Sequence, residues 1–399
     1  MAITPCFSQL DSLNSYYTQG IEASKVGDSL TYYHYFDLAN KIRPNHPGIL
    51  YHLGNAAMKI GNEESCINAL TNLIKNNVGI DFESENYRHF KNVNGFDQIS
   101  ELKNNLSKEV NVLQLKLQSP ISDHIESIAY NPKDGSYYFG SVNSRSFWKR
   151  TEKGEESIIL SSKNNDRIYA VMGLAVDDKN QILWACTAAL PQISGFTEGL
   201  EGHSSIIKID LKSNTILMTY EFNNGNAFGD IKLYNSIPYV SDGGSNNIYY
   251  LEGEEFRKLL PENNGFINLQ GIDFGNDKIY ASDYIRGLFE IDLQSKSINK
   301  LDVFRDYPER GIDGVYFNDS HLYLTQNGTN PMRVFDLELK VKNQPILKVL
   351  IQNNSQLGEP TQGTIVNGKF QFIANSSWAN YSDDNSFTGN ENGVVVLGN

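Results

Sequence analysis

The chain has little cysteine: Cys6, Cys66 and Cys186 are the three in 399 residues, and none forms a CxxC pair. Their spacing excludes a zinc knuckle and a disulfide framework, so we expect buried apolar residues or free thiols. No apolar run reaches the roughly 18 residues of a membrane span, and no basic-then-apolar leader opens the chain. We therefore expect a soluble protein. Its compartment stays open, because a leader removed during export to the periplasm or the exterior leaves no trace in the sequence.

Basic residues are also scarce, since 34 Lys and Arg face 47 Asp and Glu and give a net charge of −13. Such a charge repels nucleic acid and anionic membranes, so we expect neither as a partner. No HExxH or GxSxG motif is present. Residues 363–369 fit the GxxxxGK phosphate-loop pattern, but Phe370 stands where that loop needs Ser or Thr. We interpret this stretch as two strands joined by a hairpin turn at Asn367-Gly368.

The first 115 residues follow a helical period. Gly20 and Gly54 are 34 residues apart (54 − 20), and so are Gly27 and Gly61 (61 − 27). This is the repeat length of a helix–turn–helix unit. Over about residues 12–80 the segment resembles tetratricopeptide (TPR) repeats, with a further helix expected between residues 82 and 106. We therefore predict a TPR-like helical domain over residues 1–115.

From about residue 120 the period changes to two, with short strands rich in aromatic and β-branched residues. Six strand units begin at a small residue, spaced from 42 residues (271 − 229) to 56 residues (229 − 173). These small residues are Ser127, Gly173, Gly229, Gly271, Gly314 and Gly363. Six units long enough for four strands each predict an all-β six-bladed propeller over residues 116–399. The longest spacing contains residues 188–205, which we expect to form an inserted loop.

Two of these starts carry a family resemblance. The run Glu126-Ser127-Ile128-Ala129-Tyr130 is similar to Glu-Gly-Pro-x-Trp, and Asp313-Gly314 is similar to Asp-Gly, in the gluconolactonase, senescence-marker and strictosidine-synthase-like propellers. The resemblance covers about residues 120–399. It implies a divalent cation, usually Ca²⁺, bound by Glu126, Asp230 and Asp313, with Glu126 and Asp313 as catalytic residues and Asp313 as the general base. Asp230 matches to within one residue, and Met172 replaces an Asn or Asp of many members.

Further polar residues are expected at the same end of the propeller, where a substrate would bind. Gln270 and Gln362 offer amide oxygens, and Arg286 or Arg310 offers a cation for an anionic group. Asp242 and Asp283 follow Ser at the ends of second strands. For these two the alternative is capping of turns, for the arginines a solvated surface position, and for the two glutamines a structural role. For Glu126 and Asp313 it is hydrogen bonding to backbone amides or water at the tunnel mouth. His124 and His203 are the histidines expected near this face.

Two function classes stay open. One is a divalent-metal-dependent hydrolase of a small neutral or cationic lactone or ester, or a related enzyme, acting at the axial pocket. The other is a non-catalytic binding module, in which the propeller is a platform and the TPR groove binds a protein or peptide. The groove residues are Tyr16, Tyr17, Tyr32, Tyr33, His52 and Asn55, for which packing between helices is the alternative.

Overall fold

The computed structural model describes residues 5–223, 225–339 and 344–399, and for residues 5–11 it gives the backbone alone. The chain divides into two units. The first comprises Met1–Lys108, Phe304–Arg310 and Thr329–Pro331, and the second comprises Glu109–Val303, Gly311–Gly328 and Met332–Asn399. The predicted boundary after residue 115 falls inside a strand of the second unit, Gln114–Ser119.

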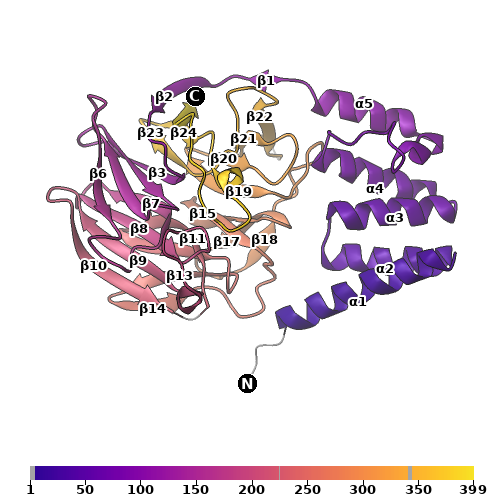
Figure 1. Cartoon of the computed structure of the whole chain (residues 1–399), viewed down its shortest axis with the longest axis horizontal. Coiled ribbons are helices and arrows are strands. Elements are labelled where there is room, and N and C mark those ends of the chain that lie inside the picture. The colour runs from indigo at the N-terminus through magenta and orange to yellow at the C-terminus, as the bar shows by residue number, and fades with distance from the viewer. Residues whose placement is uncertain (1–4, 224, 340–343) are drawn as a thin grey trace. The chain divides into compact units, whose positions relative to one another are not determined.

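The first unit contains helices that follow one another in a stack, in chain order (Figure 1). Their bounds are α1 (Pro5–Lys25), α2 (Ser29–Ile42), α3 (Pro47–Lys59), α4 (Glu63–Asn76), the 3-10 helix η1 (Arg88–Asn92) and α5 (Phe96–Leu106).

The starts of α2 and α4 show the 34-residue repeat as geometry. The side chain of Asp28 caps α2 by accepting from Thr31 N, and that of Asn62 caps α4 by accepting from Ser65 N, both at 3.1 Å. The preceding glycines, Gly27 and Gly61, have φ of 79° and 73°, a backbone conformation that only glycine adopts without strain. Both turns therefore have the same construction.

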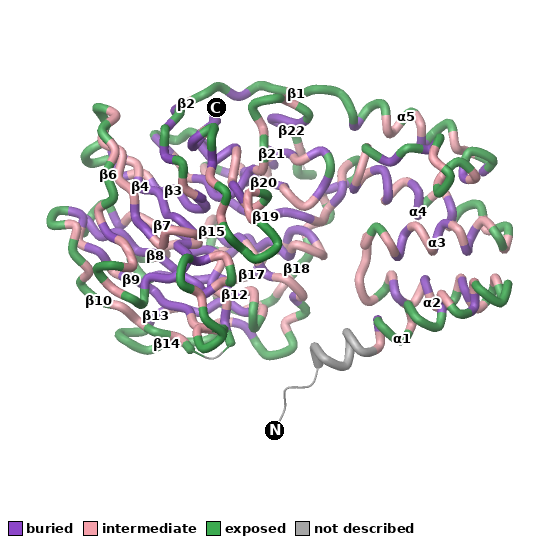
Figure 2. Tube along the Cα trace, in the orientation of Figure 1, coloured by how far each residue is buried: buried purple, intermediate pink, exposed green. Residues whose placement is uncertain are grey.

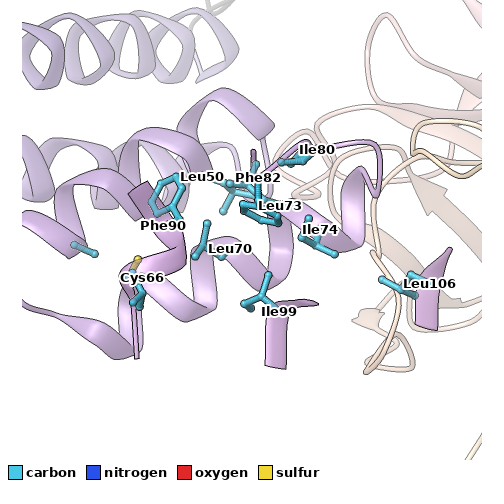
Figure 3. Close-up of a cluster of buried hydrophobic side chains, with 12 residues drawn as sticks. Leu50, Cys66, Leu70, Leu73, Ile74, Ile80, Phe82, Phe90, Ile99 and Leu106 are labelled. Atoms are coloured by element: carbon cyan, nitrogen blue, oxygen red, sulfur yellow. The ribbon is translucent and has the colours of Figure 1, made fainter. Parts of the chain in front are cut away.

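The helical core lies around α4. Leu70 and Leu73 of α4 are buried together with Phe90 of η1 and Ile99 of α5 (Figure 3). Cys66 lies in the same cluster as a free thiol. The segment after α4 therefore covers an apolar face that the first four helices leave open.

The second unit is a six-bladed propeller, as the sequence predicted. Each blade is a four-stranded antiparallel sheet, and the fifth carries β1 (Val110–Asn111) as an extra strand. The first blade consists of β3 (Ile125–Asn131), β4 (Ser136–Ser141), β5 (Ser146–Arg150) and β6 (Glu156–Ser161). The second consists of β7 (Ala170–Asp177), β8 (Ile182–Ala188), β9 (Ser204–Asp210) and β10 (Thr215–Phe222). The third consists of β11 (Phe228–Tyr234), β12 (Ile237–Asp242), β13 (Asn247–Glu252) and β14 (Glu255–Lys258).

The fourth blade consists of β15 (Leu269–Gly275), β16 (Lys278–Asp283), β17 (Gly287–Asp292) and β18 (Ile298–Lys300). The fifth consists of β19 (Ile312–Asn318), β20 (His321–Gln326), β21 (Arg333–Glu338) and β22 (Ile346–Gln352). The sixth consists of β2 (Gln114–Ser119), β25 (Val394–Gly398), β24 (Lys369–Ile373) and β23 (Gly363–Val366). The turn between β23 and β24 confirms the predicted hairpin, with Asn367 and Gly368 both at positive φ.

The propeller closes through its two chain ends. Strand β2, from the start of the unit, pairs with β25 at its end, so that Leu117 faces Val396. The innermost strands β3, β7, β11, β15, β19 and β23 pack on one another in that order, and β23 packs on β3. Purple, buried segments run along these central strands in Figure 2, whereas the outer turns are green and exposed. This closure brings the starts of strands distant in sequence to one centre.

Cys186 of β8 is also a buried free thiol, whereas the side chain of Cys6 lies outside those described. Within the described part of the chain, no helix is long and apolar enough to span a bilayer.

We predict that Leu70→Ala destabilises the helical unit by about 2–5 kcal/mol, because it empties a fully buried site. Leu30→Ala is the matched control, since Leu30 is 71% exposed, and it should change the free energy of unfolding by less than about 0.5 kcal/mol. Urea denaturation followed by the helical circular dichroism signal measures both. Equal effects of the two substitutions would contradict this assignment of the core.

Candidate functional site

A β-bulge interrupts the start of each of the first five innermost strands. In β3, Ile125 pairs with Ser141 and Ser127 with Gly140, so Glu126 is the extra residue. Asp313 is the extra residue of β19 in the same way. A bulge turns its extra residue out of the ladder and re-aims the side chain. The corresponding residues of the other three strands are Met172 in β7, Gly229 in β11 and Gln270 with Gly271 in β15.

This register corrects the position of Asp230. Its N–H donates to Ser241 Oγ at 3.0 Å, just as the N–H of Gly271 donates to Ser282 and that of Gly314 donates to Thr325. Asp230 is therefore the equivalent of Gly271 and Gly314, and the residue equivalent to Glu126 and Asp313 is Gly229. The sequence analysis placed Gly229 in line with Gly271 and Gly314, which was wrong by one residue. A Gly-Asp pair in a sequence does not reveal which of its two members forms the bulge.

The carboxylate of Asp230 is engaged between blades. Lys232 Nζ lies 2.6 and 2.8 Å from its two oxygens, and Ile272 N in the next blade donates to Oδ2 at 3.0 Å. Lys232 also lies over the ring of Tyr316, 4.9 Å from its centroid. Asp230 thus forms an ion pair with Lys232 of its own strand and is joined to the next blade by the hydrogen bond from Ile272 N.

Glu126 and Asp313 meet at one hydroxyl group. Thr361 Oγ1 lies 2.6 Å from Glu126 Oε1 and 3.2 Å from Asp313 Oδ2. A threonine hydroxyl has one proton to donate. If both hydrogen bonds form, one carboxyl group must be protonated and must donate to Thr361. The arrangement therefore favours a state in which the pair holds one proton.

The second oxygen of Glu126 is held by the segment that follows β24. Ser376 Oγ and Trp378 Nε1 donate to Glu126 Oε2 at 2.8 and 3.0 Å. His124 Nε2 lies 3.6 Å from the same oxygen. Burial lowers the pKa of His124 to about 4, so this imidazole is neutral at pH 7. Glu126 is therefore held by neutral donors, and no cation balances its charge from these positions.

Asp313 lies on the more accessible side of the pair. Asn327 Nδ2 donates to its Oδ2 at 3.2 Å, and the Asn327 amide oxygen in turn accepts from Tyr284 at 2.9 Å. Asp313, Asn327 and Glu359 each keep some exposed surface, whereas Glu126 and Thr361 are buried. Asp313 is therefore better placed than Glu126 to meet a ligand.

Burial weakens the acidity of these carboxyl groups, and the charge of Glu126 weakens that of its two carboxyl neighbours further. Burial raises the pKa of Glu126 to about 7, against the opposing hydrogen bonds of Thr361, Ser376 and Trp378. Burial, followed by the charge of Glu126, raises the pKa of Asp313 to about 8. Burial and Glu126 also raise the pKa of Glu359 to about 7. Carboxyl groups that change charge near neutral pH are typical of acid–base sites.

A calcium ion bound by Glu126, Asp230 and Asp313 does not fit this arrangement. A hard cation needs several oxygen atoms free to face it. The oxygens of Glu126 already accept from hydroxyl and indole groups, and those of Asp230 are engaged by Lys232 and by backbone amides. Among the residues that the structure describes, no group of three or more His, Cys, Asp or Glu residues is arranged to hold a metal ion.

The two glutamines have neighbours of their own. Gln362 accepts from the Tyr316 hydroxyl at 3.1 Å and donates to Gly229 O at 3.5 Å. Gln270 donates to Asn268 Oδ1 at 2.5 Å. Gln362 directly follows Thr361 in the chain, so it belongs to the same segment as the shared hydroxyl.

Asp242 and Asp283 cap turns, which was the alternative interpretation. Asp242 accepts from the backbone amides of Ala227, Gly244 and Ser245, and Asp283 from those of Ile267, Asn268, Ile285 and Arg286. Arg286 donates from Nη1 to Gly265 O at 2.5 Å. The structure does not bring these three side chains into contact with Glu126 or Asp313, and we leave them out of the candidate site.

Sequence reasoning missed Thr361, Glu359, Asn327, Ser376 and Trp378. Glu359 and Thr361 could have been found, because they stand three residues and one residue before Gln362 at a predicted strand start. Trp378 and Ser376 lie in an irregular segment, in which no period indicates where a side chain points.

Comparisons with known proteins show the fold of the second unit. A luciferin-regenerating enzyme aligns over 72% of this chain and 94% of its own, with 15% identity and a TM-score of 0.50. A protein described as a candidate gluconolactonase aligns over 72% and 93%, with 10% identity and the same TM-score. A gluconolactonase from Xanthomonas campestris aligns over 74% and 92%, with 10% identity and a TM-score of 0.49.

No family model and no curated protein matches the sequence. The likeness to the two structures with a TM-score of 0.50 shows, at these identities, a shared fold alone.

The raised pKa values predict how stability depends on pH. Each carboxyl group holds its proton more tightly in the folded chain, so its contribution to stability is largest below its unfolded pKa and falls as the pH rises through 7 to 8. Asp313→Asn removes one of these groups. We predict that the loss of stability between pH 5 and pH 8.5 is smaller in this variant by at least about 1.4 kcal/mol, the equivalent of one pKa unit.

Chemical denaturation at the two pH values measures this difference. Asp242→Asn is a poor control because it breaks a turn, so Glu152→Gln serves instead, since this carboxylate is exposed. An equal pH dependence of stability in the wild type and Asp313→Asn would contradict the prediction.

Proposed function

We propose that the propeller is an enzyme that hydrolyses a small lactone or ester, or acts on a related substrate, by acid–base chemistry at Glu126, Asp313 and Thr361. The observation that carries the proposal is the single hydroxyl group between two buried carboxyl groups. A pair of this kind stores and releases a proton near neutral pH without a metal ion.

Asp313 is the general base in this proposal. Its raised pKa, about 8, makes it a strong proton acceptor for a carboxylate, and general bases work best when their pKa lies near the operating pH. Its partial exposure supports contact with a water molecule that attacks the carbonyl carbon. The proton removed from this water passes to Asp313, and from there it is available to the leaving alkoxide.

Glu126 tunes this base and does not meet the substrate. Its own charge is one of the causes of the raised pKa of Asp313, and its oxygens are taken up by Thr361, Ser376 and Trp378. The excess of carboxyl groups around the site favours neutral or cationic substrates over anionic ones.

The calcium-dependent form of this hydrolase is the second candidate. It is favoured by the bulge positions, two of which carry carboxylates and one an amide, with a further amide at Gln362 before β23. It would require the donors around Glu126 to give way to the ion, and Asp230 would not take part.

For the helical unit we propose a TPR-type repeat that binds a protein or peptide partner. The matched turns at Gly27 and Gly61 and the matched caps at Asp28 and Asn62 support the repeat. The predicted groove residues largely engage one another or neighbouring helices: Tyr32 contacts His52, Tyr33 contacts Ser65, and Asn55 contacts His89. Tyr17, which is 36% exposed, is the residue of this predicted groove that is most open to a partner.

A pull-down with the full chain tests this proposal. Loss of the bound partner in Tyr17→Ala would support the groove, whereas equal binding by the wild type and Tyr17→Ala would contradict it.

Asp313→Asn should lower hydrolysis of a reactive lactone or aryl ester by about 100-fold or more, because the amide cannot accept the proton. Glu126→Gln should keep activity but move the rising limb of the pH profile to lower pH, since removing the neighbouring charge lowers the pKa of Asp313. Steady-state rates from pH 5 to pH 10 measure both effects. An unchanged rate in Asp313→Asn, on every substrate that the wild type hydrolyses, would refute the proposed base.

Calorimetric titration of chelator-treated protein with Ca²⁺ separates the two candidates. The proposal predicts no binding heat and no change in activity. A stoichiometric binding heat that disappears in Glu126→Gln, accompanied by a gain in activity, would replace it with the calcium-dependent candidate.

A further inference from the structure

Two irregular segments of the propeller meet near Glu126. Residues 189–203 join β8 to β9 and contain the 3-10 helix η2 (Glu198–Leu200), and residues 374–393 join β24 to β25 and contain η3 (Trp378–Asn380). Gln192 Nε2 in the first donates to Asn385 Oδ1 in the second at 3.1 Å. Residues 189–203 form the inserted loop that the longest spacing between strand units predicted.

Trp378 is the residue that connects these segments to the candidate site. Its indole N–H donates to Glu126 Oε2 at 3.0 Å. Its side chain packs against an apolar cluster whose other members come from β7 and neighbouring turns and from the insertion itself. This cluster, here called the cap cluster, consists of Val142, Tyr169, Ala170, Ala189 and Ile193, with Met172, Leu190, Phe196 and Leu200 at its edge.

We infer that Trp378 is a positioning residue, which fixes Glu126 at one end and the two segments at the other, so that these segments form a cap that closes over Glu126. The cap is a feature of the fold and does not depend on the proposed hydrolase. Only the consequence for catalysis rests on that function.

The charge of Glu126 strengthens this link. An indole N–H is a donor without acceptor capacity, and hydrogen bonds to an ionised acceptor are stronger than bonds to a neutral one. Ionised Glu126 therefore holds Trp378 and the cap more firmly than protonated Glu126. The other titratable or charged groups around Glu126 are His124 and Asp123 before β3, Asp313 in β19, Glu359 before β23, and Tyr381 after η3.

Met172 gives the cap a second contact with the centre of the propeller. It occupies the bulge position of β7, equivalent to Glu126 and Asp313, and its side chain packs at the edge of the cap cluster. Met172 therefore connects the cap cluster to the innermost strand of the second blade.

Hydrogen exchange tests this inference on the whole protein. Trp378→Phe keeps an aromatic ring and removes the N–H donor. We expect the amide protection factors of residues 189–203 to fall by about tenfold, the equivalent of one hydrogen bond to a charged group. Several of these amides are bonded within the segment and report its opening, among them Ile193, Phe196 and His203. Glu126→Gln, which keeps the acceptor without its charge, should lower protection less.

Trp148→Phe is the matched control. Its indole N–H also donates to a carboxylate, Asp123 Oδ2 at 3.3 Å, but it does not contact Glu126. It should leave the protection of residues 189–203 unchanged. Unchanged protection in Trp378→Phe, or an equal loss in Trp148→Phe, would overturn the inference.

The readout is independent of catalysis. If Trp378→Phe does not fold, Glu126→Gln decides the question, since it must lower the protection of both segments. If the wild type shows no hydrolase activity but Trp378→Phe lowers the protection of residues 189–203, the proposed function is refuted and the cap stands. If the wild type is active but Trp378→Phe leaves this protection unchanged, the cap is refuted and the proposed function stands.

Discussion

The hydroxyl group of Thr361 is the contact on which the candidate site depends. It places Glu126 of the first blade and Asp313 of the fifth within hydrogen-bond distance of one atom. This contact requires the ring of innermost strands to be closed, because Thr361 precedes β23 and β23 packs against both β19 and β3. The pairing of β2 with β25, which closes the ring, therefore maintains the geometry of the two carboxyl groups.

The same strand position supplies different chemistry in different blades. Carboxylates occupy it in β3 and β19, an amide in β15, a thioether in β7 and no side chain in β11. The buried acid that replaces a small residue in β11, Asp230, pairs with Lys232 and the next blade. Negative charge at the centre is thus divided: one carboxylate is neutralised by an ammonium group, and two share a hydroxyl group. Burial raises the pKa of both members of this second pair, and the charge of Glu126 raises that of Asp313 further, so that the pair provides a proton store.

The sequence predicted the fold well because the strand units repeat. The aromatic strands and turn dipeptides recur, so the six strand starts could be located within a residue or two. The site was less accessible. Glu126 and Asp313 were found because they stand beside small residues at those starts, but the bulge that distinguishes Gly229 from Asp230 depends on pairing with β12. Trp378 and Ser376 lie in an irregular segment, where contacts depend on tertiary structure. Asp242 and Asp283 look like site residues in the sequence because turn caps and ligands use the same side chain.

The most direct test of the shared-hydroxyl site is a carboxyl ¹³C NMR titration of protein labelled at Asp and Glu, with Glu126→Gln and Asp313→Asn to assign the two signals. Coupled carboxyl groups titrate as a pair with macroscopic pKa values. The account predicts that both signals move together and that at least one transition lies near neutral pH. Two independent transitions below about pH 5, in the ordinary range of exposed carboxyl groups, would contradict it.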